Sequence, residues 1–306
     1  MSEEIYDILI IGGGPAGMTA GLYAVRKNLK VLLIAKDFGG QALWAPMIEN
    51  YMGYSVVSGP DLMMRFQKQI SSLPIKTRIP DEVIGLSKEG EVFITETKFG
   101  GRYKARVVIV ASGKRPKTLD IPGEKEFTGR GVSYCVTCDA PLFTNKIVAV
   151  VGGGNSAVSA ALDLNKTASK VYLIVRREMR ADQILQEKLA KAEKVEKIIG
   201  FSPKEIKGRE RVEGILLRRV ENGEEMELKV DGVFVEIGLI PNTDFLKDMV
   251  KVNELGEIII NCNCETSVEG IFACGDVTNV VGKQIIIACG DGAKAALSAY
   301  HYLLRK

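Results

Sequence analysis

A glycine pattern that occurs twice, each time between an apolar strand and a helix, restricts the possible folds of this chain most. The first copy is Gly-x-Gly-x-x-Gly at Gly12, Gly14 and Gly17, after a β-branched segment at residues 5–11 and before a predicted helix at 18–27. In such a loop the glycines permit a tight turn, close approach of a pyrophosphate to the backbone, and close packing of helix on strand. A glycine turn without a ligand is the alternative reading of a single copy.

The second copy reads Gly-x-Gly-x-x-Ala at Gly152, Gly154 and Ala157. It follows an apolar strand at residues 146–151 and opens a predicted helix at 157–165. Two strand–glycine–helix units are far more specific than one, because each requires the same local context. The sequence therefore predicts an α/β protein with two dinucleotide sites.

Length and charge agree with this fold class. The 306 residues accommodate roughly two domains of about 150 residues each. With 41 basic and 38 acidic residues the net charge is only +3, which argues against a nucleic-acid surface. The first residues lack the cationic start of a secretory signal, and no apolar run approaches the ~20 residues of a membrane span. We expect a cytoplasmic protein without nucleic-acid or membrane partners.

A Cys-x-x-Cys pair, Cys135 and Cys138, is followed directly by Asp139. In an α/β protein of a reducing compartment such a pair favours a redox disulfide, and the neighbouring carboxyl group is a candidate proton donor to a departing thiolate. A zinc site would need further ligands, and an inert buried pair is the remaining alternative. We predict these three residues as catalytic and expect no metal site.

The only other close pair, Cys262 and Cys264, is expected at the end of a strand at residues 257–260. Residues two apart on an extended chain lie on the same face, so a second redox pair is conceivable, although we do not favour it.

The ends of the strands that follow each glycine loop bear on ribose recognition. The strand at 170–175 ends in Arg176 and Arg177, with Arg180 close behind. An acidic residue there would bond a ribose 2′-hydroxyl, whereas arginines suit a 2′-phosphate; a solvated basic turn is the alternative. The strand at 30–34 lacks an acidic residue at its end unless Asp37 serves.

The rest of the pattern is that of short strands and one long helix. Antiparallel strands are expected at residues 83–86, 92–97 and 103–110, and a small sheet at 201–206, 212–220 and 225–229. A loop at 284–289 is expected before a C-terminal helix at 290–304. Breaks at residues 111–116 and 241–245 predict two crossings between domains.

Together these motifs resemble the low-molecular-weight thioredoxin reductases nearly end to end. The resemblance implies two Rossmann-like dinucleotide-binding domains, an NAD(P)H domain of residues 116–244 inserted into an FAD domain of residues 1–115 and 245–306. The positions that match the family's FAD-binding elements are Gly12, Gly14, Pro15, Ala16, Gly17, Gly39, Gly40, Gln41, Asn50, Ala111, Gly113, Gly275, Asp276, Gln284 and Ile285. Those that match its NAD(P)H-binding elements are Gly152, Gly154, Asn155, Ser156, Ala157, Arg176, Arg177 and Arg180.

The resemblance also implies an activity. Electrons would pass from NADPH, or from NADH, through FAD and the Cys135–Cys138 disulfide to a thioredoxin or glutaredoxin-like protein, in a homodimer. Because nicotinamide and disulfide must both reach one flavin, we expect the inserted domain to rotate about hinges near residues 113–117 and 241–245.

The chain departs from the family pattern at three places. Ala140 stands where glycine is usual and Asn155 where an acidic residue is common. The segment Val175–Ala181 lacks the family's histidine and is one residue short. A relative fed by ferredoxin would account for this segment, and a non-enzymatic FAD-binding redox sensor is a third possibility. A peroxide-linked disulfide reductase is less favoured, because 306 residues show no appended thioredoxin-like domain.

Overall fold

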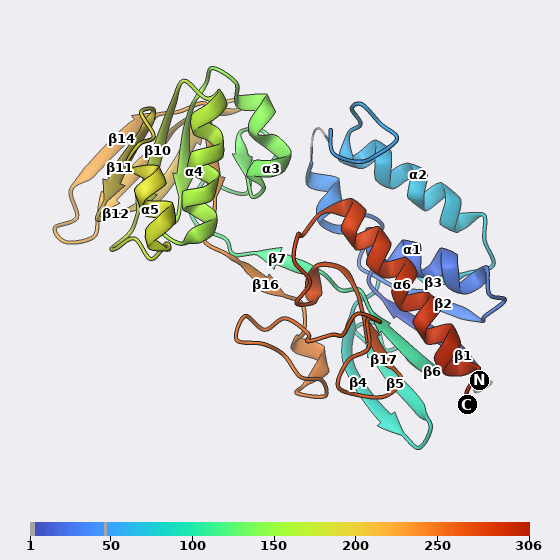
Figure 1. Cartoon of the computed structure of the whole chain (residues 1–306). Helices are drawn as coiled ribbons and strands as arrows, with labels where there is room; N and C mark the ends of the chain where they lie inside the picture. Colours follow the sequence, from blue (N-terminus) through green and yellow to red (C-terminus); the bar gives the residue numbers. More distant parts are fainter. Residues whose placement is uncertain (1–3, 46–47) are drawn as a thin grey trace. The chain divides into compact units, whose positions relative to one another are not determined.

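The computed structural model describes residues 4–45 and 48–306, which fall into two compact units (Figure 1). The first unit contains the described residues up to Leu43, residues 48–115 and residues 240–306. The second contains chiefly residues 116–239 and is therefore inserted into the first. The predicted fold class of two Rossmann-like units is confirmed, whereas the assignment of FAD to one and NAD(P)H to the other stays a prediction.

The first unit is built on a mainly parallel sheet of order β3-β2-β1-β6-β5-β4, with β17 also paired to β6. Its strands are β1 (Ile5–Ile11), β2 (Val31–Ile34), β3 (Lys76–Arg78), β4 (Val83–Glu89), β5 (Val92–Thr97), β6 (Arg102–Val110) and β17 (Ile271–Ala273). The antiparallel pairing expected for β4, β5 and β6 is present. In addition, β6 pairs in parallel with β1 and β17, which places it inside the sheet.

Helices α1 (Pro15–Val25) and α6 (Ile285–Leu303) cover one face of this sheet, and α2 (Gly59–Ser71) contacts α1. The unit also has short 3₁₀ turns η1 (Gly40–Trp44), η3 (Asp244–Leu246) and η4 (Gly275–Val277). Alternate β1 residues serve opposite cores: Ile8 and Ile10 pack with α1 and α6, and Leu9 packs on the other face. Helices α1 and α6 lie side by side (Figure 1), and a Cβ atom at Gly292 would lie 2.1 Å from the carbonyl oxygen of Ala16.

The second unit repeats the design with a parallel sheet of order β11-β10-β9-β15-β8. Its strands are β8 (Val132–Ser133), β9 (Ile147–Val151), β10 (Lys170–Val175), β11 (Val195–Ile199) and β15 (Gly232–Val235). Its helices are α3 (Val136–Asp139), α4 (Asn155–Thr167) and α5 (Gln183–Leu189), with a 3₁₀ turn η2 (Ala140–Phe143). Val148 and Val150 of β9 pack toward α4, and the alternate residues Ala149 and Val151 pack on the other face.

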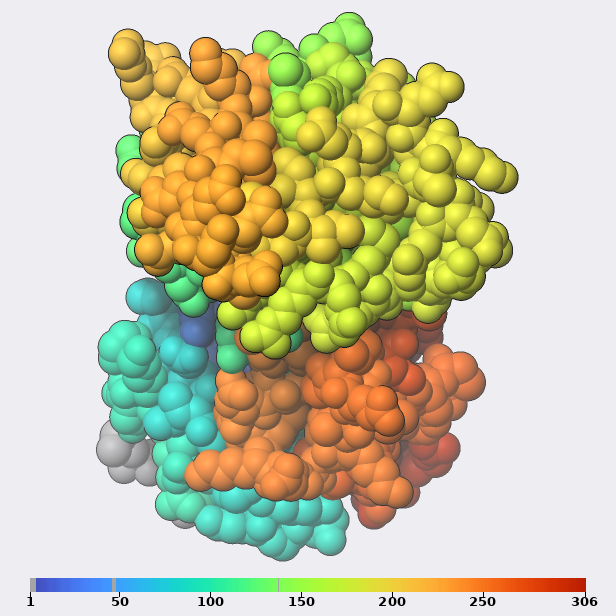
Figure 2. Space-filling model, turned by 90° about the vertical axis from the view of Figure 1, so that its left-hand side faces the viewer, coloured from blue at the N-terminus to red at the C-terminus, as the bar shows by residue number. Residues whose placement is uncertain are grey.

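An antiparallel meander covers that other face. It consists of β12 (Phe201–Gly208), β13 (Val212–Arg219) and β14 (Glu225–Lys229), as the sequence predicts. Its inward residues Ile206, Ile215 and Leu217 join the core of Ala149 and Val151. Figure 2 shows the outer side chains of β11 and the meander, yellow to orange, gathered on one face of this unit.

The chain passes between the units through two short strands that pair with each other, β7 (Lys114–Pro116) and β16 (Leu239–Pro241). Asn242, in the first unit directly after β16, forms hydrogen bonds with the residues that precede β7. Its backbone N–H donates to the Gly113 carbonyl over 3.0 Å, and its side-chain amide donates to the Ser112 carbonyl over 2.8 Å. The chain therefore passes between the units through a hydrogen-bonded double linker.

Two secondary-structure predictions near the C-terminus are wrong. No strand forms at 257–260; Ile258 makes only isolated bridges, because the Asn253 side chain accepts bonds from Leu255 N–H and Glu257 N–H and holds a turn instead. Helix α6 begins at Ile285, not at Gly290, with Gln284 at its N-cap. The apolar, β-branched first turn favours a non-helical prediction in isolation, yet it is helical here although Ile286 is exposed. No helix within residues 4–45 and 48–306 is long and apolar enough to cross a membrane.

The expectation that Cys262 and Cys264 lie on one face of an extended strand end is also wrong. The chain turns at these residues instead of running extended, since Asn261 Oδ1 accepts from the backbone N–H groups of Asn263 and Glu265. Cys264 has a φ of 62° and is fully buried, whereas Cys262 is exposed. Both are free thiols in different environments, so they are not arranged as a second redox pair.

Candidate functional site

The predicted redox pair is a disulfide at the start of α3. Cys135 Sγ and Cys138 Sγ are 2.19 Å apart, and the Cα atoms are 5.4 Å apart. Cys135 is the N-cap of the helix, and its sulfur accepts a bond from the Cys138 backbone N–H at 3.3 Å. Cys135 and Cys138 are both partly exposed.

Asp139 closes α3 with a buried carboxyl group. Its residue is only 8% exposed, and its Oδ1 has no hydrogen-bond partner among the described residues. Burial raises the pKa of this carboxyl group to about 6, although a bond with the Ser133 side chain acts in the opposite direction. Asp139 can therefore hold a proton at a pH where an ordinary aspartate has released it.

Two residues that the sequence reading missed hold the segment before the disulfide. The Ser133 hydroxyl accepts a bond from the Cys135 backbone N–H at 3.1 Å. The Tyr134 hydroxyl donates to buried Glu124 at 3.0 Å, and Glu124 also accepts the backbone N–H groups of Leu119 and Asp120. Because these partners lie up to ten residues away, no local motif reveals them.

The second glycine loop joins β9 to α4 in the same unit as the disulfide. Gly152 has a φ of 148°, and a Cβ atom there would lie 2.3 Å from the Glu236 carbonyl oxygen. At Gly154 a Cβ atom would meet nothing within 4 Å, so the backbone is open to a ligand at the N-terminus of α4. Asn155 and Ser156 form the first turn, and Ala157 packs inward. These features fit a pyrophosphate.

The basic segment after β10 folds back to this loop. The Arg180 backbone N–H donates to the Gly153 carbonyl at 2.7 Å, and Asn155 exchanges two bonds with Asp182 at 2.9 and 2.8 Å. Arg176, Arg177 and Arg180 are exposed, and no ion pair to them is found in the described part of the chain. The structure thus brings the arginines and the glycine loop to one edge of the sheet.

The first glycine loop has the same geometry in the other unit. A Cβ atom at Gly12 would lie 2.2 Å from the Ala111 carbonyl oxygen, and one at Gly17 would lie 1.9 Å from the Gly12 carbonyl oxygen. Gly14 is open, with its nearest atom, the Gly39 carbonyl oxygen, 3.9 Å from such a Cβ atom. Only glycine permits the two close approaches, and the open position fits a dinucleotide phosphate.

Other predicted FAD residues gather around this loop. Gly39 N–H donates to the Gly13 carbonyl at 2.9 Å, and Gly40 lies beside Gly14 and begins η1, in which Gln41 follows. The Asp37 carboxylate accepts the Gly40 N–H at 2.8 Å, so it serves this turn.

The C-terminal predicted residues reach the same region. Gly275 has a φ of 72°, and a Cβ atom there would lie 2.9 Å from the Cβ atom of Ala16, which follows Pro15. Burial raises the pKa of the Asp276 carboxyl group. Asn50 donates to the Gln284 side chain at 3.0 Å, immediately before Ile285 opens α6.

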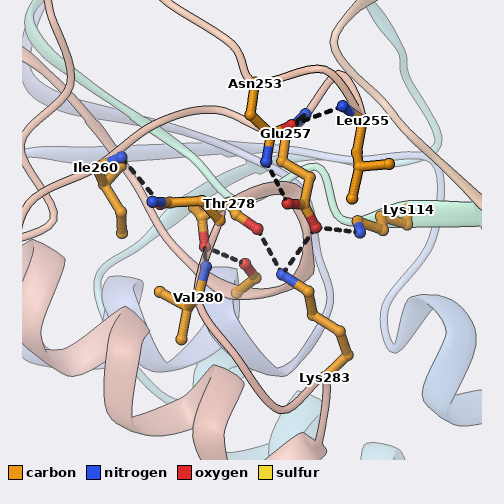
Figure 3. A network of polar contacts seen from close by, with 10 residues as sticks. Lys114, Asn253, Leu255, Glu257, Ile260, Thr278, Val280 and Lys283 are labelled. Carbon is orange, nitrogen blue, oxygen red and sulfur yellow. Dashed lines mark hydrogen bonds and ion pairs between the residues drawn. The ribbon is translucent and has the colours of Figure 1, made fainter. Parts of the chain in front are cut away.

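A buried ionic network beside these residues was also missed (Figure 3). Glu257 accepts a bond from Lys114 at 2.5 Å, lies 3.3 Å from Lys283, and accepts from Asn253 at 2.7 Å. Burial acts to raise the pKa of Glu257, but Lys114 and Asn253 hold it below its usual value. Lys283 also donates to the Thr278 carbonyl. The network fixes linker strand β7 to the segment that leads into α6.

A family model of the pyridine nucleotide-disulphide oxidoreductases matches residues 6–292, which is most of the chain. The chain belongs to this family. FAD and a pyridine nucleotide are the cofactors of this family and of the thioredoxin reductases to which the chain is similar. No group of three or more His, Cys, Asp or Glu residues in the described ranges could hold a metal ion.

The resemblance to thioredoxin reductases is confirmed. The thioredoxin reductase of Streptococcus pyogenes has a TM-score of 0.93 and 40% identity, covering 100% of both chains. That of Giardia duodenalis has a TM-score of 0.91 and 33% identity, covering 98% of this chain and 99% of the other. The F component of the alkyl hydroperoxide reductase of Escherichia coli is 42% identical over 99% of this chain, which spans 59% of that protein's length.

Proposed function

We propose that this protein is an FAD-dependent reductase that passes electrons from NADPH to a disulfide of a thioredoxin or glutaredoxin-like protein. One observation carries the proposal: the Cys135–Cys138 disulfide, with buried Asp139 beside it, lies in the same unit as the second glycine loop. The proposed assembly is a homodimer, and the proposed compartment is the cytoplasm.

The two cysteines exchange electrons with the partner's disulfide by dithiol–disulfide exchange. FAD held at Gly12, Gly14 and Gly275 would supply the transfer of two electrons from the pyridine nucleotide to the protein disulfide. Cys135 and Cys138 take up these electrons and two protons and become a dithiol. One thiolate attacks the partner's disulfide, forming a mixed disulfide and expelling a partner thiolate. The other cysteine then attacks the mixed disulfide, which releases the reduced partner and restores Cys135–Cys138.

Asp139 has a defined part in this sequence. A thiolate leaves more readily when an acid protonates it as the sulfur–sulfur bond breaks. A carboxyl group with a pKa of about 6 still carries a proton in part of the population at neutral pH. We assign Asp139 as that acid and, in the reverse step, as the acceptor of the thiol proton.

Two observations bear on the choice of donor and acceptor. The exposed arginines beside the second glycine loop favour a 2′-phosphate, and hence NADPH over NADH. The likeness to the F component of alkyl hydroperoxide reductase supports a second candidate, transfer of electrons to a peroxide-reducing partner protein.

The deciding experiment is an anaerobic titration of the purified protein followed by coupled assays. We expect a yellow protein that NADPH bleaches, and reduction of thioredoxin with NADPH as donor. NADH and reduced ferredoxin are the alternative donors, and glutaredoxin and a peroxiredoxin with hydroperoxide the alternative acceptors. Preference for the peroxiredoxin would favour the second candidate. Binding of FAD with no turnover of any disulfide protein would overturn the proposal and leave a redox sensor.

A further inference from the structure

One ionisable residue beside the redox pair has no part in the chemistry above. Glu236 follows β15 directly, and its backbone N–H donates to the Val151 carbonyl at 2.9 Å. Strand β15 lies next to β9, from which the chain crosses through α4 to β10 on the opposite side. In doubly wound sheets the crevice at the carboxyl ends of two such strands is where ligands bind. Glu236 lies at this point of the second unit.

Glu236 lies beside the redox segment. Strand β15 pairs in parallel with β8, with Phe234 opposite Ser133, so Glu236 comes level with the residues that lead into α3. Its carboxyl group interacts with the backbone N–H of Val136, the first residue of α3. Val136 is covalently attached to Cys135, so the carboxyl group lies one peptide unit from a redox cysteine. Burial raises the pKa of Glu236 to about 7, although the bond from Val136 acts to lower it. The group therefore changes its charge near neutral pH.

The segments beside Glu236 differ in the charged groups that they contribute. The redox helix contributes Asp139 and the two cysteines, and neither β9 nor the glycine loop after it contributes a charged side chain. In the linker segment, Lys117 Nζ lies 4.0 Å from the position of a Cβ atom on Gly238. Burial and the Val136 amide are the only causes of the Glu236 shift within the described structure.

We propose that Glu236 is a positioning residue for the redox pair, which holds the first N–H of α3 and whose ionisation controls how readily the Cys135–Cys138 dithiol forms a thiolate. This inference rests on the proposed function. A carboxylate disfavours a second negative charge nearby, so ionised Glu236 raises the pKa of the neighbouring thiol. When Glu236 is neutral, it no longer raises the pKa of the thiol. Groups that interact in this way titrate as a pair, which broadens the thiol titration.

The test measures thiol ionisation directly. The FAD-loaded protein is reduced with dithiothreitol, and the rate of alkylation by iodoacetamide is followed by mass spectrometry at Cys135 and Cys138 across the acid-to-alkaline range. Glu236→Gln keeps an acceptor for the Val136 N–H but cannot ionise. We expect the variant to show a single-proton profile with its midpoint lower by on the order of one pH unit, against a broad profile in the wild type.

Two controls are built into the chain. Exposed Cys262 is a free thiol in the other unit, so its alkylation profile should be the same in every variant. Glu196→Gln removes an exposed carboxyl group from β11 of the same sheet and should leave the Cys135 and Cys138 profiles as in the wild type.

The outcomes separate the possible roles. Identical profiles for Glu236→Gln and wild type would overturn the proposal, and loss of the helix contact in Glu236→Ala alone would then assign a purely structural role. If Glu236→Gln does not fold, infrared difference spectra of the wild type decide: reduction of the disulfide must perturb a carboxyl band that titrates near neutral pH. The readout needs neither NADPH nor thioredoxin, so failure of the proposed function leaves it interpretable.

Discussion

Two carboxyl groups beside one disulfide have pKa values raised by burial, but to different extents. The pKa of Asp139 is raised to about 6 and that of Glu236 to about 7. Asp139 ends the redox helix and has an oxygen without a partner among the described residues, whereas Glu236 bonds to the backbone at the beginning of that helix. Two carboxyl groups whose environments shift their pKa values to different extents are suited to different roles. Asp139 is suited to move a proton, and Glu236 to set the charge around the pair.

The role of Asp139 predicts the effect of Asp139→Asn. The amide keeps the size of the side chain but cannot donate a carboxyl proton, so dithiol–disulfide exchange should slow by about 10²–10⁴-fold. The pH dependence has a definite sign: protonated Asp139 is lost as pH rises through its pKa of about 6, so the wild-type rate should decline there and the variant rate should not. Stopped-flow mixing of reduced protein with oxidised thioredoxin measures both.

The control for this prediction is Asp163→Asn on α4, an exposed aspartate paired with Lys166. It should react at the wild-type rate at every pH. A wild-type rate for Asp139→Asn would remove Asp139 from the mechanism.

At the scale of elements, one edge of the second sheet brings together the residues predicted to bind a pyridine nucleotide. The loop after β9 is open at Gly154, and the loop after β10 is tied to it by the bond between Arg180 and Gly153. Parallel strands bring these loops together because their carboxyl ends share an edge. The arrangement supplies both the helix N-terminus for a pyrophosphate and cations for a further phosphate.

This arrangement predicts the effect of replacing Arg176 and Arg177 by Ala. Each charge-assisted bond to a phosphate contributes about 1.5–3 kcal/mol, so losing one should raise the KM for NADPH at least about tenfold. The KM for NADH, which lacks the 2′-phosphate, should change little. Arg209 and Arg211, exposed in the turn between β12 and β13, provide a matched double-Ala control. Equal effects on both nucleotides would assign the arginines to general electrostatic attraction.

Sequence reasoning succeeds for elements whose cause is local. The glycine loops, the Cys pair and the strand–helix alternation are readable because turn, packing and cap requirements act within a few residues. Sequence reasoning fails where a residue's contacts come from parts of the chain that are distant in sequence. Glu257 is bonded to Lys114, 143 positions away, and Glu236 to Val136, and neither carboxylate belongs to a local motif. The start of α6 at Ile285 also differs from the prediction, because the β-branched composition of its first turn favours a loop.

At the scale of the whole chain, the candidate sites divide between the two units. Residues from both ends of the chain build the first glycine loop and its neighbours, including Gly12, Gly14 and Gly275. The disulfide and the second glycine loop belong to the inserted unit. Because the first site uses no residue of the redox helix, binding of FAD and reduction of a partner protein can be separated by substitution.

The double variant Cys135→Ser and Cys138→Ser makes this separation. We expect it to bind FAD as the wild type does, because the first unit keeps all its contacts. NADPH should still bleach the flavin at the wild-type rate, since hydride transfer needs no thiol. Reduction of thioredoxin should be lost, because no other disulfide exists within the described residues to relay electrons.

The measurements are flavin absorbance, stopped-flow bleaching by NADPH, and a coupled thioredoxin assay on the same preparation. Cys262→Ser, at an exposed free thiol, is the matched control and should retain all three properties. If the double variant reduces thioredoxin at the wild-type rate, the relay is not Cys135–Cys138, and Cys262 becomes the next thiol to test. If it binds no FAD, the two sites depend on each other, and the separation argued from the fold is wrong.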